Sequence, residues 1–214
     1  MTDPAAVTND ADRVVGVGPY PGGPSAWPDD PRLDPELLEA GDARNVGDEF
    51  RYWRLDAVVE ELDRRRNPLQ IAIENLGHDF NIGSVVRTAN AFNVRAVHIV
   101  GRRRWNRRGA MVTDRYLRVV HHRTVTEFVA AVDMPVIGID NIPGSVPLEG
   151  AILPRECLLV FGEESAGLSE EMAAACERIH HITQYGSTRS INVGAAAAIA
   201  MYEWARQHLP GDGE

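Results

Sequence analysis

The sequence contains no lysine, because all 22 of its basic residues are arginine. Every cationic site is therefore built on a guanidinium group, which binds phosphate oxygens through paired hydrogen bonds. Cysteine is also scarce: Cys157 lies in an apolar run and Cys176 in an alanine-rich helical pattern, and neither has CxxC spacing. Isolated cysteines of this kind are usually buried small hydrophobes. Their arrangement argues against metal binding and redox chemistry.

Long hydrophobic runs are missing too. No apolar segment approaches the roughly 20 residues that a membrane helix needs. The opening residues MTDPAAVTNDADR lack the basic and apolar regions of a signal peptide. We therefore expect a cytoplasmic protein without a membrane partner. Its 214 residues, 44% of them hydrophobic, suffice to bury a full core.

The net charge of −9 is unevenly distributed. Residues 1–50 hold 11 of the 31 acidic residues and 3 of the 22 basic ones, so the rest of the chain is almost neutral. The overall acidity therefore does not exclude a polyanionic partner. The densest basic cluster, GRRRWNRRG, combines guanidinium groups with one aromatic ring, which suits single-stranded or looped RNA. A solvated charged loop is the simpler alternative. The candidate RNA-binding residues are Arg102, Arg103, Arg104, Trp105, Arg107 and Arg108.

Composition divides the chain into segments. The first 42 residues contain 7 of the 13 prolines and no apolar periodicity, which predicts an extended or disordered acidic leader over 1–42. Over 43–66 we expect a connecting segment with an amphipathic helix, because WRLDAVVEELDRRR spaces its apolar residues at helical intervals. Residues 67–209 then form the principal domain, and 210–214 a short tail.

Short apolar runs alternate with helical patterns through the principal domain. Strand-like runs are LQIAIEN, AVHIVG, PVIGID, CLLVFGEE and IHHITQ, and helical patterns lie at 82–92, 124–132, 169–179 and 192–209. This alternation predicts an α/β domain, with a mostly parallel sheet covered by helices on both faces. Ligands of such sheets bind at the carboxyl ends of the strands. That end would hold NLGHDFN, GEESAG and TQYGSTRSIN in one candidate site.

Each of these three segments also has an ordinary structural interpretation. Asn81 could cap the following helix through its side chain, and Arg87 could be a surface arginine a turn and a half later. The acids of GEESAGLSEE could be solvated, with Ser169 capping the next helix. The small residues of NVGAAAAIA could pack in the core, although this does not explain Ser190 and Asn192.

Taken together, the three segments resemble the motifs of the SpoU (TrmH-type) branch of the SPOUT methyltransferases over residues 69–204. One departure is Ile182-Thr183-Gln184, where the family often has Ile-Pro-Met. Many members also carry a separate RNA-binding domain, so RNA selection is expected to rest on the catalytic body here. The matched residues are Asn81, Gly83 and Arg87 in the first motif, Gly162, Glu164, Gly167, Leu168 and Ser169 in the second, and Ser190, Ile191, Asn192 and Val193 in the third.

The resemblance implies a C-terminal trefoil knot, a homodimer, and methyl transfer from S-adenosylmethionine to a ribose 2′-hydroxyl of tRNA or rRNA, without a metal. Arg87 would hold the phosphate beside the target ribose and stabilise negative charge, because an arginine does not lose its proton in a protein. The other implied catalytic residues are Asn81, Glu164, Ser190 and Asn192. Implied cofactor contacts, mainly through backbone groups, are Phe161, Gly162, Ile182, Gln184 and Ile191.

Some interpretations stay open at this stage. His78 and Asp79 are unusual additions to the first motif, and we hypothesise that one of them lies near the reacting hydroxyl. A non-catalytic RNA-binding paralogue and a base-directed SPOUT methyltransferase are the alternatives to a ribose methyltransferase. A Rossmann-type oxidoreductase is disfavoured, because no glycine fingerprint follows the first strand of the domain.

Overall fold

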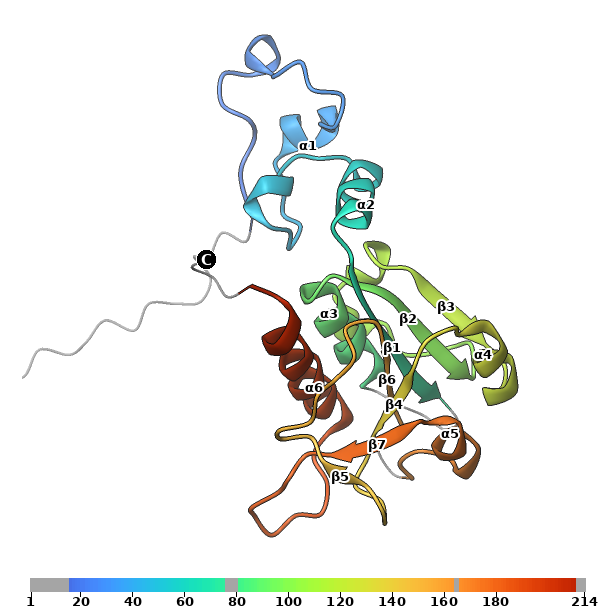
Figure 1. Cartoon of the computed structure of the whole chain (residues 1–214). Helices are drawn as coiled ribbons and strands as arrows, with labels where there is room; N and C mark the ends of the chain where they lie inside the picture. The colour runs from blue at the N-terminus through green and yellow to red at the C-terminus, as the bar shows by residue number, and fades with distance from the viewer. Residues whose placement is uncertain (1–15, 76–80, 164–165, 211–214) are drawn as a thin grey trace, which may run out of the picture. The chain divides into compact units, whose positions relative to one another are not determined.

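The computed structural model of the protein describes residues 16–75, 81–163 and 166–210. The chain forms two compact units, Met1–Glu61 and Leu62–Glu214, and each is described by itself (Figure 1). Within the described residues no helix is both long and apolar enough to cross a membrane.

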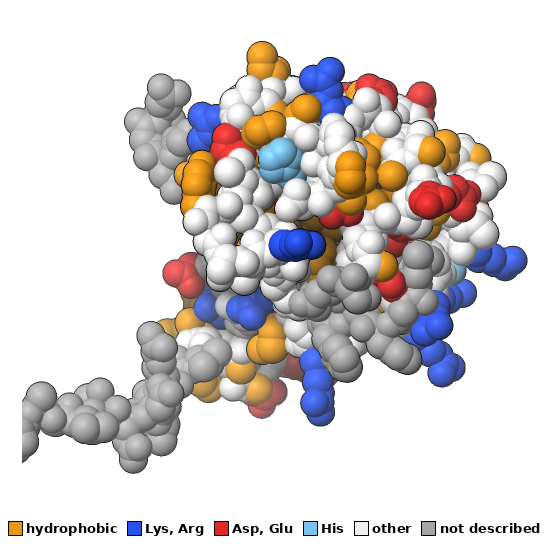
Figure 2. Space-filling model, turned by 90° about the horizontal axis from the view of Figure 1, so that it is seen from below, with side chains coloured by type: hydrophobic (Ala, Val, Ile, Leu, Met, Phe, Trp, Pro, Cys, Tyr) orange, Lys and Arg blue, Asp and Glu red, His pale blue; other side chains and the backbone are white. Residues whose placement is uncertain are grey.

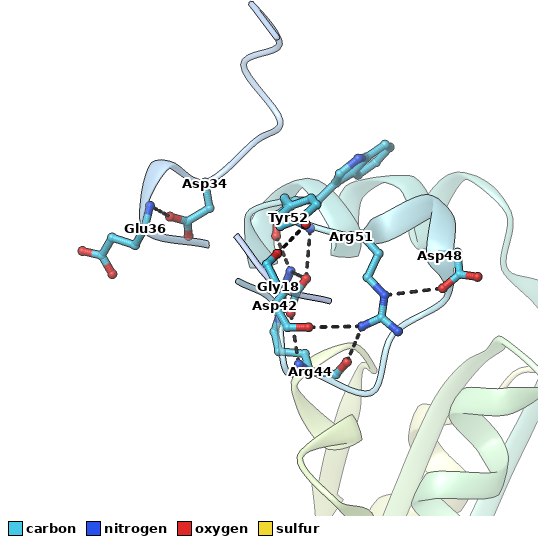
Figure 3. A network of polar contacts seen from close by, with 9 residues as sticks. Gly18, Asp34, Glu36, Asp42, Arg44, Asp48, Arg51 and Tyr52 are labelled. Carbon is cyan, nitrogen blue, oxygen red and sulfur yellow. Dashed lines mark hydrogen bonds and ion pairs between the residues drawn. The ribbon is translucent and has the colours of Figure 1, made fainter. Parts of the chain in front are cut away.

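The described part of the first unit is held together by a buried carboxylate. It contains η2 (Pro24–Ala26), α1 (Pro35–Ala40), η3 (Asp48–Phe50) and the first turns of α2 (Leu55–Arg64). Asp42 is completely buried, and Arg44 donates to both of its carboxylate oxygens, at 2.8 and 2.6 Å. The backbone N–H of Tyr52 donates to the same carboxylate at 2.9 Å (Figure 3). Burial opposes ionisation of Asp42, but these hydrogen bonds outweigh it and lower its pKa to about 2.

The prediction of an extended or disordered leader over 1–42 is wrong for residues 16–42. Val17 and Asp42 form an antiparallel bridge, and the Tyr52 hydroxyl donates to the Gly18 carbonyl at 2.6 Å. Proline and glycine content indicates little regular structure, and a chain can still fold when long-range hydrogen bonds satisfy its backbone. The Asp42–Arg44 pair that organises this unit leaves no periodic pattern in the sequence.

The second unit is built on a parallel sheet. Its seven strands lie in the order β3-β2-β1-β6-β4-β7-β5, and every neighbouring pair is parallel. The strands are β1 (Asn67–Asn75), β2 (Val94–Gly101), β3 (Val119–His122), β4 (Val136–Ile139), β5 (Val146–Pro147), β6 (Leu158–Phe161) and β7 (Arg178–His181).

Helices cover both faces of this sheet (Figure 1). The helices α3 (Ile82–Ala91) and α6 (Val193–His208) pack on one face, where Trp204 and Ile82 are completely buried among strand side chains. On the other face lie α4 (Val125–Ala131) and α5 (Glu170–Ala175), with Phe128 and Met172 in a second apolar cluster. The α/β class and the parallel sheet with helices on both faces are therefore confirmed.

Two strands, β3 and β5, were not predicted from the sequence. Strand β3 has four residues at one edge of the sheet, three of them only half-buried, and β5 has two exposed residues at the other edge. Edge strands lack the continuous apolar run that marks a buried parallel strand. The predicted helix of the connecting segment is present as α2, which starts at Leu55.

Candidate active site

The second and third motifs enclose one cavity beyond the carboxyl ends of β4, β6 and β7. Its volume is about 290 Å³. Figure 2 views the domain from this end of the sheet and shows a hollow with apolar side chains in its depth and charged side chains at its rim. The wall includes Phe161, Gly162, Ile182, Gln184, Ser190 and Ile191, together with Ile139, Asp140, Asn141, Ile142, Glu163, Ala166, Gly167, Arg189, Val193 and Ala196. All five residues expected to contact the cofactor thus lie on one wall.

The second motif forms a closed turn against this cavity. The N–H of Glu163 donates to the Gly167 carbonyl at 3.0 Å, and the N–H of Gly167 donates back at 2.8 Å. A Cβ at Gly162 would overlap the backbone of Gly167, and Gly167 itself has a φ of +71°. Both motif glycines are therefore required by the backbone geometry. Asp140, which the sequence did not single out, fixes the turn by accepting from the N–H of Leu168 at 2.7 Å.

A buried glutamate at the end of β1 holds the far side of the same turn. The Ser169 N–H and hydroxyl donate to the two carboxylate oxygens of Glu74 at 2.8 and 2.7 Å. Burial raises the pKa of Glu74, the Ser169 hydrogen bonds act against this, and Glu163 and Glu171 add to it. Sequence analysis missed Glu74. The available signal was the glutamate inside the apolar run LQIAIEN. A charged side chain in a buried strand rarely stays without a partner, so this residue could have been expected to have one.

The first and third motifs meet through two asparagines. Asn192 Nδ2 donates to Asn81 Oδ1 at 2.9 Å. Asn192 Oδ1 also accepts from the N–H groups of Gly194 and Ala195, so Asn192 caps α6. The structural alternative, in which Asn81 caps α3 through its side chain, does not hold, because that side chain makes no capping hydrogen bond and accepts from Asn192 instead. The pairing fixes the starts of two helices that are 111 residues apart in sequence.

The remaining catalytic candidates are less enclosed. Arg87 is exposed on α3, outside the wall of the cavity. Ser190 is exposed at the cavity mouth. Glu164, His78 and Asp79 lie outside the described residues.

The cavity wall contains one buried polar atom without a partner. Gln184 Oε1 is shielded from solvent and accepts no hydrogen bond from any described residue. The wall mixes polar side chains with apolar ones, and Ile139, Ile182 and Ile191 are among the apolar ones. A ligand with flat apolar faces and a hydrogen-bond donor on its edge would fit these residues, and the adenosine part of S-adenosylmethionine has both features.

A second groove, of about 570 Å³, lies beside the edge strand β3 and is strongly basic. Arg103, Arg107, Arg118 and Arg123 line it with His121 and Trp105. The Arg107 guanidinium lies over the Trp105 ring, 5.5 Å from its centre. Of the predicted RNA-binding residues, Arg103, Trp105 and Arg107 thus share one groove, whereas Arg102, Arg104 and Arg108 are exposed outside its lining. Arg118 and Arg123 were not predicted, because they flank the strand that the sequence did not reveal.

The arginine segment is fixed to the first motif at both ends. Asn75 is buried, and its Nδ2 donates to the carbonyls of Arg102 and Arg104 at 2.6 and 3.1 Å. At the other end Gly83 abuts Gly109, and a Cβ on Gly83 would lie 2.8 Å from the Gly109 Cα. The basic groove and the start of α3 are therefore parts of one packed assembly.

The two cysteines are free and unreactive. Burial raises the thiol pKa of both Cys157 and Cys176 to about 12. Among the residues that the structure describes, no group of three or more His, Cys, Asp or Glu side chains could hold a metal ion.

The chain is similar to known proteins in both sequence and structure. The SpoU rRNA Methylase family matches residues 68–202. The tRNA (guanosine(18)-2′-O)-methyltransferase of Escherichia coli K12 is 28% identical over 163 residues, which are 73% of this chain and 70% of that enzyme. The TrmH/SpoU tRNA modifying enzyme of A. aeolicus superposes with a TM-score of 0.63 at 22% identity, over 72% of this chain and 82% of that one. The SpoU methyltransferase AviRb from Streptomyces viridochromogenes, solved with AdoMet, superposes with a TM-score of 0.60 at 24% identity, over 68% of this chain and 63% of that one.

Proposed function

Because the chain belongs to the SpoU rRNA Methylase family, we propose that it transfers a methyl group from S-adenosylmethionine to a ribose 2′-hydroxyl of tRNA or rRNA. As a member of this family it is an S-adenosylmethionine-dependent RNA methyltransferase. The observation that carries the proposal is the Asn81–Asn192 hydrogen bond, which joins the first motif to the motifs around the cavity.

The cavity is the proposed cofactor site. S-adenosylmethionine supplies a methyl group already activated on a sulfonium. Phe161, Gly162, Ile182, Gln184 and Ile191 would hold it, and the turn clamped by Asp140 and Glu74 would form one side of the site. The rigid turn supports this assignment, since methyl transfer requires the acceptor oxygen and the methyl carbon to be aligned within fractions of an ångström.

On the substrate side we assign positioning roles to polar residues of the three motifs. The ribose hydroxyl is a poor nucleophile, so it must be aligned while its proton leaves to water or to the neighbouring phosphate. Arg87, with its exposed guanidinium, would hold that phosphate and stabilise charge on the oxygen. Asn81 and Asn192 would orient the ribose, and Ser190 and Glu164 are the further residues that we assign to this role. Whether His78 or Asp79 lies near the hydroxyl stays a hypothesis, checked by methyl transfer in the two alanine variants.

The basic groove beside β3 is the proposed contact for RNA phosphates. Four arginines and the half-buried Trp105 offer paired hydrogen bonds to phosphates and a ring for a stacked base. Arg102, Arg104 and Arg108 would contact RNA beyond the groove. The tight packing between Gly83 and Gly109 supports this assignment, because RNA held there would lie beside the first motif.

Replacing both Arg118 and Arg123 with alanine should weaken binding to tRNA and flatten its salt dependence. Each lost phosphate contact lowers the slope of log K against log salt by about 0.7 on a single strand. The matched control replaces Arg95 and Arg155, which are also exposed but do not line the groove. Filter binding at several salt concentrations gives the slopes. Equal slopes for the two double variants would contradict the role of the groove.

The family resemblance also implies the assembly and the topology, which we include in the proposal. The protein would be a homodimer in the cytoplasm, where tRNA and rRNA are modified, without a membrane partner. Exposed Ile199 and Tyr202 on α6 support the dimer. The chain around β6, β7 and the cavity loops would form the trefoil knot.

The decisive experiment is transfer of tritiated methyl groups from S-adenosylmethionine to RNA from a host that lacks the protein, followed by alkaline hydrolysis. Alkali needs a free 2′-hydroxyl to cleave RNA, so ribose methylation should leave the label in resistant dinucleotides. Label in mononucleotides would indicate a base methyltransferase. No transfer despite cofactor binding would favour a non-catalytic RNA-binding paralogue. Arg87→Ala should lower transfer by two orders of magnitude or more while leaving cofactor binding unchanged.

A further inference from the structure

The unpaired carbonyl oxygen of Gln184 is the least explained polar atom of the cavity. Buried side-chain carbonyls almost always accept a hydrogen bond, because burial removes the water that would otherwise satisfy them. Gln184 Oε1 is buried and has no hydrogen-bond partner among the residues that the structure describes. It belongs to the wall of the proposed cofactor site. A ligand in that site is therefore the natural source of the missing donor.

The neighbouring groups that the structure describes do not supply this donor. The hydroxyl and the N–H of the adjacent residue, Thr183, both donate to the carboxylate of Glu149, at 3.0 and 3.1 Å. Across the loop, Asn141 Nδ2 is already directed to the carbonyl of Arg189 at 3.1 Å. The loop is thus held in place by other contacts, and the Gln184 side chain is not needed to hold it.

The sequence points in the same direction. Gln184 stands where the family that this chain resembles often has methionine, and a methionine side chain fills space without leaving a strong acceptor unsatisfied. An amide oxygen that is buried at this position without a donor costs free energy when the cavity is empty. That cost is removed only when a donor reaches Oε1.

The chemistry of the ligand identifies which donor fits. The ribose hydroxyls of S-adenosylmethionine both donate and accept, and its ammonium group calls for a charged or multiply hydrogen-bonded partner. The adenine N6 amino group only donates, and it sits on the edge of a flat apolar ring. Ile139, Ile182 and Ile191 provide apolar surface for such a ring. A glutamine amide is also a common partner of adenine in nucleic-acid recognition.

We propose that Gln184 Oε1 accepts a hydrogen bond from the N6 amino group of the cofactor's adenine, so that this side chain selects adenine over other purines. The inference rests on the proposed function for the identity of the ligand. It adds a side chain that recognises the base to a site otherwise expected to bind it through backbone groups.

The test is calorimetric and needs neither RNA nor turnover. S-adenosylhomocysteine is compared with its 6-oxo analogue, in which hypoxanthine replaces adenine and an acceptor replaces the N6 donor. The wild-type protein should bind the adenine compound at least tenfold more tightly, because the analogue places two acceptors against each other. Gln184→Met should bring the two affinities to within about threefold. Gln184→Glu keeps an acceptor and should retain the preference for adenine.

Gln207→Met is the matched control. Gln207 lies on α6 and is fully paired, with Oε1 accepting from the Leu153 N–H at 3.0 Å and Nε2 donating to the Ala151 carbonyl at 2.9 Å. Its replacement should leave the adenine preference intact. An unchanged preference in Gln184→Met, or equal wild-type affinities for the two compounds, would overturn the inference while leaving the proposed function in place. Failure of the wild-type protein to bind either compound would overturn both.

Discussion

At the scale of single residues, the buried histidines of the second unit make its stability depend on pH. His98 Nδ1 lies 2.8 Å from His122 Nε2, and His98 Nε2 lies 2.7 Å from Gln70 Oε1. The amide oxygen can only accept, so His98 carries its proton on Nε2 and accepts from His122. The ring of Phe128 covers both imidazoles edge-on. Burial, the neighbouring His122 and the charge of Arg118 together lower the pKa of His98 to about 4.

Acid should therefore destabilise the fold before most carboxylates protonate. A histidine whose pKa is lowered on folding contributes stability that is fully present above about pH 6.5 and is lost as the pH falls toward 4. The loss reaches about 3 kcal/mol for His98, and His122, whose pKa burial also lowers, acts in the same direction. Urea unfolding at several pH values between 7.5 and 4.5 measures this loss of unfolding free energy. His98→Gln should flatten the profile, whereas His208→Gln should not, and equal profiles would refute the assignment.

At the scale of helices and strands, two short helices carry the same type of cap with different consequences. Ser169 Oγ accepts from the Met172 N–H to cap α5, and Thr124 Oγ1 accepts from the Glu127 N–H to cap α4, both at 3.1 Å. Only Ser169 also donates to the buried Glu74 at the end of β1. The cap of α5 therefore belongs to the wall of the cavity, while the cap of α4 stabilises its own helix alone.

Ser169→Ala and Thr124→Ala should separate these two roles. Each loses a cap hydrogen bond, which costs about 1 kcal/mol, and thermal unfolding should report a lower melting temperature for both. Ser169→Ala should in addition weaken S-adenosylmethionine binding several-fold, because the turn after β6 loses one of its two hydrogen bonds to Glu74 and keeps only that of the backbone N–H. Calorimetric titration measures this difference. Equal cofactor affinities in the two variants would show that the hydrogen bond from the Ser169 hydroxyl to Glu74 does not organise the site.

At the scale of the whole molecule, α6 presents apolar side chains that one chain leaves uncovered. Tyr202 is 62% exposed and Ile199 43% exposed, although the opposite side of the same helix is completely buried at Trp204. Residues three apart lie on one face of a helix. Such a face suits a second copy of the chain, which is the assembly that we propose.

Replacing Ile199 and Tyr202 together with aspartate should convert the proposed dimer into a monomer. Buried charges without partners are costly, so the interface should not form. Light scattering after gel filtration measures the mass. Ile152→Asp is the control, since Ile152 is 92% exposed but lies outside α6. A wild-type monomer would contradict the proposed assembly, and a double variant with unchanged mass would exclude this face.

The sequence predicted five of the seven strands and the five residues expected to contact the cofactor, all of which line the cavity. These predictions succeed because apolar runs and motif spacings are local properties of the chain. It missed β3, Glu74 and the order of residues 16–42, each of which depends on partners distant in sequence: β2 for the edge strand, Ser169 for Glu74, and Tyr52 for Asp42. For Asn81 the helix start indicated a possible cap, but it could not reveal the partner that the side chain has, Asn192.

The contact between Gly83 and Gly109 has an evolutionary consequence. Each position lies against the backbone of the other, so a side chain at either one would need the opposing segment to move. The two positions should therefore covary among relatives. Where a larger residue replaces Gly83, the segment between β2 and η4 (Arg108–Ala110) should differ in length, and the arginines that it carries should change with it. Substrate range and the start of α3 would then diverge together in this lineage.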